Sequence, residues 1–274
     1  MFSVLLSCYS QDNPEELELS LKSIFNQSSK PSQIVIVKDG LLTEELDKVI
    51  DDFLKNSKLI EIEIVKIKEN IGLGPALLKG VSKCNQPYII RQDSDDISRK
   101  DRLYNLEKFI YENESYDVIG THISEFNEEP NDLNCLRKVP LDQKSIKKYS
   151  YLRNPINHVS VCIKKDFFKK FSYKSVPFHE DYFLWIEALN NGARFINLDF
   201  VSVDVRVGRQ MISRRRGINY LKHEIYFLYL CYKSKYFSLA NCLIYLILRL
   251  PFRIFPLILV QFFYLNFLRK KKKK

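Results

Sequence analysis

Short apolar runs alternate with amphipathic segments along the first 92 residues, and this alternation limits the possible folds more than any other feature of the sequence. Between the apolar runs, apolar side chains recur at helical spacing, and the predicted helices begin near Pro14, at Thr43 and at Gly72. Strands that alternate with helices indicate an α/β fold with a mostly parallel sheet, in which ligands bind at the carboxyl ends of the strands. The apolar runs, which predict strands, are residues 1–7, 33–37, 60–67 and 87–90.

Beyond residue 96 the alternation loosens, although strand and helix patterns continue. The chain length fits one large domain, alone or with an appendage. We predict helices over residues 99–112, 180–190 and 218–232, strands over 117–123, 158–164 and 195–207, and a polar stretch over 127–142.

Composition excludes several classes of protein. Hydrophobic residues make up 46% of the 274 residues, and Gly and Pro are sparse, so the chain is neither disordered nor collagenous. The six cysteines have no CxxC spacing, which argues against a zinc ribbon or a disulfide framework and favours a reducing, cytosolic setting. The first residues lack the basic start of a secretory signal, and we expect none.

The positive charge of the chain is confined to its last quarter. Residues 206–274 hold sixteen Lys and Arg and one acid, Glu224, and therefore carry +15. Because the whole chain carries +10, residues 1–205 carry −5. This distribution argues against a nucleic-acid partner and for one end that meets an anionic surface.

Two uncharged runs, residues 236–248 and 254–268, lie in this basic region. Neither reaches the ~20 residues that a membrane-spanning helix needs. Arginines and prolines between and within the runs favour a broken helical element in the membrane interface, with Arg269 and the lysines of 270–274 on anionic headgroups. A buried helical hairpin, a tilted span, and a lysine tail that binds nucleic acid or is merely solvated are the alternatives.

An acidic motif follows the apolar strand at 87–90 directly. Asp93, Asp95 and Asp96 place three carboxylates within four residues, where they repel one another unless a cation joins them. A hard divalent metal with oxygen ligands is the natural partner, and it can bridge to the phosphates of a nucleotide. Alternatively, Asp96 caps a helix over residues 99–112.

Two weaker signals lie at the ends of other strands. Asp39, before Gly40, sits where an acid can bind the base or ribose of a nucleotide, although Asp-Gly is also an ordinary turn. The loop over residues 70–76 contains glycines and enters a helix, so its backbone can approach a ligand, but it matches neither a P-loop nor a dinucleotide-binding fingerprint.

Two later clusters can contribute to chemistry. Glu180 and Asp181 open a short helix, either as charge partners of its N-terminus or as a carboxylate base aimed at a substrate hydroxyl. The arginines of 206–209 and 214–216 are dense enough to bind phosphate, or they are a solvated surface.

In their order, these features resemble family two glycosyltransferases with the GT-A fold. The resemblance covers residues 3–217, and Gln92 departs from it by standing where a hydrophobic residue is usual, which leaves the metal motif intact. The segments that carry it are Ser7-Cys8-Tyr9, Asp39, Asn70-Ile71-Gly72, Asp93-Ser94-Asp95 and Glu180-Asp181. Those that look like the amylovoran-biosynthesis-type subgroup, which builds bacterial surface polysaccharides, are Lys38-Asp39-Gly40, residues 72–77, Asp93 to Ile97 and Asn154-Pro155-Ile156-Asn157-His158.

The resemblance implies a role for each matching residue. Asp95 would be the principal ligand of Mn²⁺ or Mg²⁺ on the donor diphosphate. Asp181 would be the general base of an inverting transfer. The residues that it places around the UDP-sugar and its acceptor are Tyr9, Asp39, Asn70, Arg91, Asp93 and Glu180.

The resemblance also implies an organisation of the chain. Residues 1–217 would form the catalytic domain, with a nucleotide-sugar half over 1–96 and an acceptor half over 97–217. The resemblance does not extend to residues 218–274; their apolar runs and positive charge predict a helical, basic, membrane-associating region.

The basic end suggests the acceptor. We hypothesise that Arg214, Arg215 and Arg216 meet the diphosphate of a lipid-linked sugar, such as an undecaprenyl-diphosphate N-acetylhexosamine, on the cytoplasmic face of a bacterial inner membrane. The products would belong to O-antigen, capsule or exopolysaccharide.

Two other classes of protein fit parts of the pattern. A sugar-phosphate nucleotidyltransferase would need a basic, glycine-rich loop near the N-terminus, and residues 9–12 contain neither glycine nor a basic side chain. A non-catalytic, membrane-bound polysaccharide-binding protein would have no need of the acids.

Overall fold

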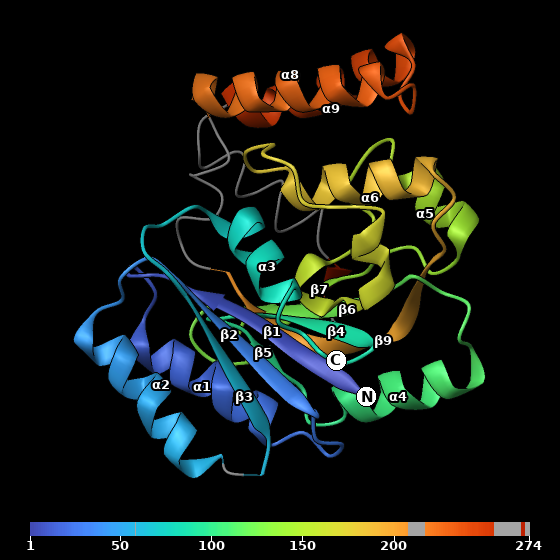
Figure 1. Cartoon of the computed structure of the whole chain (residues 1–274). Coiled ribbons are helices and arrows are strands. Elements are labelled where there is room, and N and C mark those ends of the chain that lie inside the picture. The colour runs from blue at the N-terminus through green and yellow to red at the C-terminus, as the bar shows by residue number, and fades with distance from the viewer. Residues whose placement is uncertain (58, 208–216, 255–269, 272–274) are drawn as a thin grey trace.

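The computed structural model describes residues 1–57, 59–207, 217–254 and 270–271, and its centre is one mixed sheet (Figure 1). Within the described residues the sheet has ten strands, in the order β10-β7-β6-β8-β4-β1-β2-β3, with β9 beside both β6 and β5. The strands are β1 Phe2–Cys8, β2 Gln33–Asp39, β3 Glu61–Ile67, β4 Tyr88–Asp93, β5 Ile97–Ser98, β6 Val118–Phe126, β7 Cys135–Arg137, β8 Cys162–Lys164, β9 Phe195–Arg206 and β10 Lys270–Lys271.

The first four strands form the parallel half of the sheet that the alternating pattern predicts. β1 pairs with β2 on one side and with β4 on the other, and β3 continues beyond β2. The order of the strands therefore reverses between β1 and β4, and ligands of open α/β sheets bind at the carboxyl ends beside such a reversal. Ser7 lies opposite Asp93, and Cys8 lies opposite Lys38, so the ends of β1, β2 and β4 share one edge.

Helices cover both faces of the sheet, and two more form an outer layer (Figure 1). α1, α2 and α4 pack on one face and α3, α5 and α6 on the other, while α8 and α9 lie on the outside of α6. The helices are α1 Pro14–Phe25, α2 Glu44–Asn56, α3 Leu73–Val81, α4 Arg102–Glu112, α5 Gln143–Tyr149, α6 Glu180–Asn190, α8 Gly217–Lys233 and α9 Leu239–Ile254, with 3₁₀ turns η1 His158–Ser160 and η2 Lys165–Lys169.

Local signals set where the first helices begin. The Asn13 side chain accepts hydrogen bonds from the amides of Glu15 and Glu16, and Pro14 stands in the first turn of α1. Thr43 caps α2 in the same way, through the amide of Leu46. These starts agree with the sequence predictions.

α3 lies against the sheet because it carries glycine at the point of contact. A Cβ atom added to Gly80 would lie 2.3 Å from Leu5 Cδ1 and 2.7 Å from Val37 Cγ2. The close approach holds the N-terminus of α3 over the carboxyl edge of the parallel strands.

Three predictions about the second half are corrected. α4 begins at Arg102 and not at 99, with Asp101 as its cap, so Asp96 does not cap a helix. Residues 158–164 form η1 followed by the short strand β8, because the amide of Ser160 donates to the carbonyl of Asn157 in a 3₁₀ turn. The polar stretch also contains β7.

The C-terminal region is helical as far as it is described. α9 takes in most of the first uncharged run and continues through Pro251 to Ile254. Among the described residues, no helix is long and apolar enough to span a membrane. The second uncharged run lies almost entirely outside the described residues.

Candidate active site

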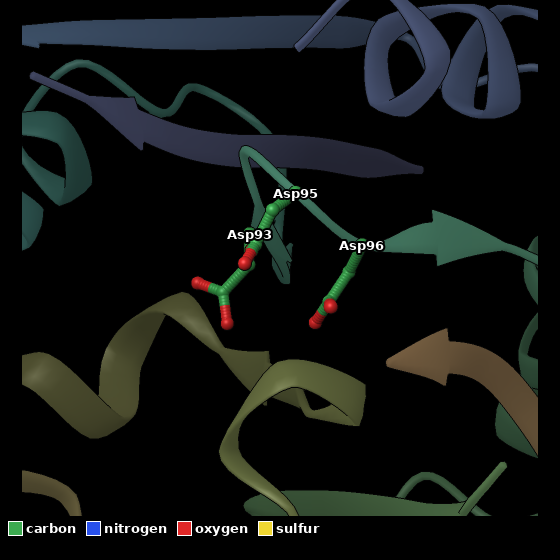
Figure 2. A group of neighbouring side chains, drawn as sticks. All are labelled: Asp93, Asp95 and Asp96. Carbon is green, nitrogen blue, oxygen red and sulfur yellow. The ribbon is translucent and has the colours of Figure 1, made fainter. Parts of the chain in front are cut away.

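Three carboxylates meet in the loop between β4 and β5. Asp93, Asp95 and Asp96 each offer an oxygen within 4.8 Å of the other two, and all three side chains point to the same side of the loop (Figure 2). The loop stands at the carboxyl end of β4, where the order of the strands reverses. The cluster therefore lies where the fold binds ligands.

The electrostatics of this cluster favour a bound cation. Burial and, after it, the charge of Asp93 raise the pKa of Asp95 to about 7. Burial and the charges of Asp93 and Asp95 raise the pKa of Asp96 well above its usual value. One Asp96 oxygen, Oδ2, is buried and has no hydrogen-bond partner among the described residues.

The donor set fits a hard divalent metal. Mg²⁺ binds oxygen at 2.0–2.1 Å, so two ligands on opposite sides of the ion lie about 4.2 Å apart. The three aspartate oxygens lie within 4.8 Å of one another, close enough to bind one ion together. Asp95 and Asp96, with Asp93, are the residues that would hold the ion.

Gln92 fixes the acidic loop from beneath. Its amide group donates to the Asp96 carbonyl at 2.8 Å, and its Oε1 accepts from Ser98 Oγ at 2.7 Å and from Arg102 Nη1 at 3.0 Å. Arg102 also donates to the Arg91 carbonyl at 2.8 Å. The polar residue that departs from the family pattern thus joins a buried network that holds the loop.

Arg91 brings positive charge to the acids. It is 3% exposed and forms an ion pair with Asp93, yet its Nε and Nη1 atoms are buried without hydrogen-bond partners. A buried guanidinium with free donors suits an anionic ligand at the same edge.

Asp39 holds the glycine loop at the end of β2. Its two oxygens accept from the amides of Ile71 at 2.8 Å and Gly72 at 3.1 Å, and Asn70 Nδ2 donates to its carbonyl at 3.3 Å. Tyr9 stands at the end of β1, where its amide bonds to Asp12. Tyr9, Asp39 and Asn70 thus share the edge with the acidic loop, and their contact with a nucleotide stays a prediction.

Glu180 and Asp181 form the first turn of α6. Both line a pocket with His158, Tyr173 and residues of α3. Burial raises the pKa of the Glu180 carboxyl, and the charge of Asp181 raises it further.

A hydrogen bond from another loop orients Asp181. Asn154 Nδ2 donates to Asp181 Oδ2 at 2.6 Å, and Asn154 Oδ1 accepts from the amide of Ile156 at 3.3 Å. The first bond crosses 27 positions of sequence.

Tyr173 connects this pocket to the acidic loop. Its hydroxyl bonds to His158 Nε2 at 2.8 Å. Burial raises the pKa of Tyr173, Arg91 lowers it, and the charges of Asp181 and Asp93 raise it further. Tyr173 and Asp181 thus line one pocket, and the Tyr173 hydroxyl is held by His158.

Three predicted site residues, Arg214, Arg215 and Arg216, fall outside the described residues. Arg206, from the neighbouring cluster, lies beside the acidic loop, where its amide donates to Asp96 Oδ1 at 2.9 Å and its side chain pairs with Glu16.

Several residues of the site were not assigned a role from the sequence. Asp12 lies within electrostatic range of Asp93 and Asp95, and burial raises its pKa. Asn154 and His158 were part of the subgroup resemblance, which was the one available signal for them. Tyr173 and Arg102 stand in ordinary apolar and basic surroundings that carry no such signal.

The fold and the acidic loop define a GT-A transferase, the α/β class that uses nucleotide-diphospho-sugars. The model of Glycosyl transferase family 2 matches residues 3–174, more than half of the chain, and the chain belongs to this family. The protein is therefore a glycosyltransferase, and the family resemblance of the sequence is confirmed. Neither the nucleotidyltransferase nor the non-catalytic alternative agrees with this membership.

Two curated relatives match nearly the whole chain. The UDP-Gal:alpha-D-GlcNAc-diphosphoundecaprenol beta-1,3-galactosyltransferase of Escherichia coli is 34% identical over 270 residues, which are 98% of this chain and 97% of the relative. The amylovoran biosynthesis glycosyltransferase AmsE of Erwinia amylovora is 32% identical over 265 residues, 96% of this chain and 98% of the relative.

Among solved structures, TarS 1–349 of S. aureus in complex with UDP-GlcNAc matches with a TM-score of 0.63 at 18% identity. The match covers 83% of this chain and 65% of that one. At this identity the similarity concerns the fold.

Proposed function

We propose that the protein transfers a hexose or N-acetylhexosamine from a UDP-sugar, with inversion, to a lipid-linked diphosphate sugar. The observation that carries the proposal is the carboxylate cluster at the carboxyl end of β4, and the pocket that Asp181 lines with Tyr173 and His158 supports it. The full-length similarity to a galactosyltransferase whose name specifies UDP-Gal and a diphosphoundecaprenol acceptor supports the choice of substrates.

In this reaction Asp181 and Arg91 have separate roles. Asp181 accepts the proton of the acceptor hydroxyl, held in place by Asn154, and the oxygen attacks the anomeric carbon from the face opposite the nucleotide. Arg91 adds positive charge beside Asp93, close to where the diphosphate leaves.

A divalent ion, Mn²⁺ or Mg²⁺, held by Asp95 and Asp96 with Asp93, would offset the charge that grows on the departing UDP. The all-oxygen donor set and the unpartnered Asp96 oxygen support this assignment.

We further infer a peripheral position on the cytoplasmic face of a bacterial inner membrane, in O-antigen, capsule or exopolysaccharide synthesis. The exopolysaccharide relative supports the pathway, and the basic end of the chain supports the membrane surface as a partner. Arg214, Arg215 and Arg216 stay our candidates for binding the acceptor diphosphate. Nucleic acid is not an expected partner. The proposed division of the chain stays a catalytic domain over residues 1–217 and a C-terminal region over residues 218–274.

Asp181→Asn tests the proposal most directly. The variant keeps an oxygen that can accept from Asn154 but removes the base, so transfer should fall by roughly 100- to 10,000-fold while UDP binding persists. Mass spectrometry of products from a panel of UDP-sugars and a synthetic lipid-diphosphate N-acetylhexosamine measures the transfer.

Glu187→Gln is the matched control, because Glu187 lies on the same helix and pairs with Lys174 away from the pocket. It should transfer at the wild-type rate. Asp181→Asn with wild-type transfer, or a wild-type protein that gives no product with any UDP-sugar, would contradict the proposal.

A further inference from the structure

The outer side of the α8–α9 hairpin is apolar over both helices. We call this surface the hairpin face. Its side chains are between 39% and 75% exposed, and within each helix they repeat at intervals of three, four or seven residues, so they form one stripe on each helix. They are Ile218, Ile225, Tyr229 and Tyr232 of α8, and Leu239, Leu243, Ile247 and Leu250 of α9.

The exposed positions of α2 are polar or charged. The exposed residues of α2 include Glu44, Lys48, Asp51 and Lys55, while its apolar side chains are buried or half-buried. The hairpin reverses this arrangement on its outer side, so water alone does not account for its composition.

The charge of the hairpin is positive wherever it is exposed. Glu224 is the one acid between residues 217 and 254, and it is fully buried, with both oxygens 2.8 Å from the guanidinium of Arg253. Lys222, Lys233 and Lys235 are exposed. A surface of aliphatic side chains, tyrosines and lysines without an exposed carboxylate is complementary to an anionic lipid interface.

The hairpin is packed on the helix that carries Asp181. The ring of Phe227 stacks on His179 with centroids 4.7 Å apart, and Tyr220 contacts Phe178 at 5.0 Å. Asp181, two residues after His179 in the sequence, lines the pocket. The two helices form the outermost layer of the molecule (Figure 1), and the side chains of the hairpin face are exposed.

We propose that the hairpin face binds the interface of a bilayer that contains anionic lipids. Ile and Leu enter the acyl boundary, the tyrosines lie at headgroup level, and the lysines meet lipid phosphates. The inference deepens the proposed function, on which it rests for its biological setting, because it names the surface that brings the pocket to a lipid-linked acceptor.

Vesicle co-sedimentation of the full chain tests this surface. Wild-type protein should bind vesicles of phosphatidylcholine mixed with phosphatidylglycerol, more weakly in high salt, and vesicles of phosphatidylcholine alone less well. Tyr229→Asp/Leu243→Asp should lower the binding to mixed vesicles at least about tenfold. Tyr111→Asp/Leu59→Asp, on side chains 87% and 96% exposed elsewhere, is the matched control and should bind as wild type.

A second variant keeps the inference testable if Tyr229→Asp/Leu243→Asp misfolds. Lys222→Glu/Lys233→Glu keeps the apolar stripes and should weaken binding to mixed vesicles without changing binding to phosphatidylcholine. Wild-type binding by both hairpin variants would overturn the inference. So would light scattering that shows a wild-type dimer, a monomeric Tyr229→Asp/Leu243→Asp variant and no vesicle binding, because the face would then join two copies.

Transfer to a short-chain, water-soluble diphosphate acceptor separates this inference from the proposed function. Tyr229→Asp/Leu243→Asp should retain wild-type transfer to that acceptor in the absence of vesicles. Vesicle binding without transfer to any acceptor would overturn the proposed function and leave the hairpin face standing. Transfer without vesicle binding would overturn the inference about the hairpin face and leave the proposed function standing.

Discussion

At the scale of single residues, Asn154 has a place beside the base that its sequence position does not reveal. Its 2.6 Å hydrogen bond to Oδ2 orients the carboxylate of Asp181. A hydrogen bond to a charged group contributes about 1.5–3 kcal/mol. Asn154→Ala should therefore lower kcat roughly 10- to 100-fold, with little change in KM for the UDP-sugar.

The pH profile distinguishes positioning from a structural role. Donation to the carboxylate favours its charged form, so the acid limb of kcat should move to higher pH in Asn154→Ala. Asn113→Ala, at the end of α4, removes a similar side chain and should leave rate and profile unchanged. Equal losses in both variants, or an unmoved acid limb, would speak against positioning.

His179 should make the folded protein sensitive to acid. Burial lowers its pKa to about 4, against about 6.5 in an unfolded chain. Between these pH values the unfolded chain takes up a proton that the folded chain does not, so the free energy of unfolding falls as pH falls. From pH 7 to pH 5 this loss is about 2 kcal/mol.

His179→Phe keeps an aromatic ring against Phe227 and removes the titrating group. Urea unfolding at pH 7 and pH 5, followed by the fluorescence of Trp185, the single tryptophan, measures the effect. The variant should lose less stability than wild type over this interval. Parallel losses would show that His179 does not titrate as its burial indicates.

At the scale of elements, one buried ion pair joins α8 to α9. Glu224 and Arg253 side chains are 0% and 8% exposed, and the Arg253 guanidinium also lies over the ring of Tyr220. Removing one partner leaves a buried charge without compensation, which costs about 3–5 kcal/mol. Glu224→Gln should lower the unfolding free energy by that amount in urea titrations.

The pair between Lys174 and Glu187 provides the comparison, because both partners are partly exposed. Pairs of this kind contribute about 0–1 kcal/mol. Glu187→Gln should therefore leave the urea midpoint almost unchanged. A similar small effect of Glu224→Gln would mean that the hairpin accepts water around Arg253.

At the scale of the whole molecule, local sequence patterns predict one half of the sheet much better than the other. Caps such as Asn13 and Thr43 and the alternation of apolar residues are local, and they predicted the parallel half of the sheet and its ligand-binding edge. The second half of the sheet depends on contacts between residues that are far apart in the sequence, and no local pattern predicts such contacts.

The candidate site shows the same division. The acidic motif was visible as three adjacent carboxylates, but only the path of the loop shows that Asp96 joins Asp93 and does not cap α4. The contact of Asn154 with Asp181, and that of α8 with α6, likewise depend on tertiary packing.

The acidic cluster lowers the stability of the metal-free protein. Three carboxylates in a partly buried loop repel one another, and burial adds to the cost of charging Asp95 and Asp96. Asp95→Asn should therefore stabilise the metal-free protein at pH 8, on the order of 4 kcal/mol. Thermal unfolding in the presence of a chelator measures this gain.

The same variant should lose the response to metal. Mn²⁺ with UDP should raise the melting temperature of wild type, because a ligand that binds the folded state alone stabilises it, and should not raise that of Asp95→Asn. Asp166→Asn, on an exposed residue of η2, should follow wild type in both conditions. A less stable metal-free Asp95→Asn protein, or one that still responds to Mn²⁺, would mean that Asp95 serves the fold and not the ion.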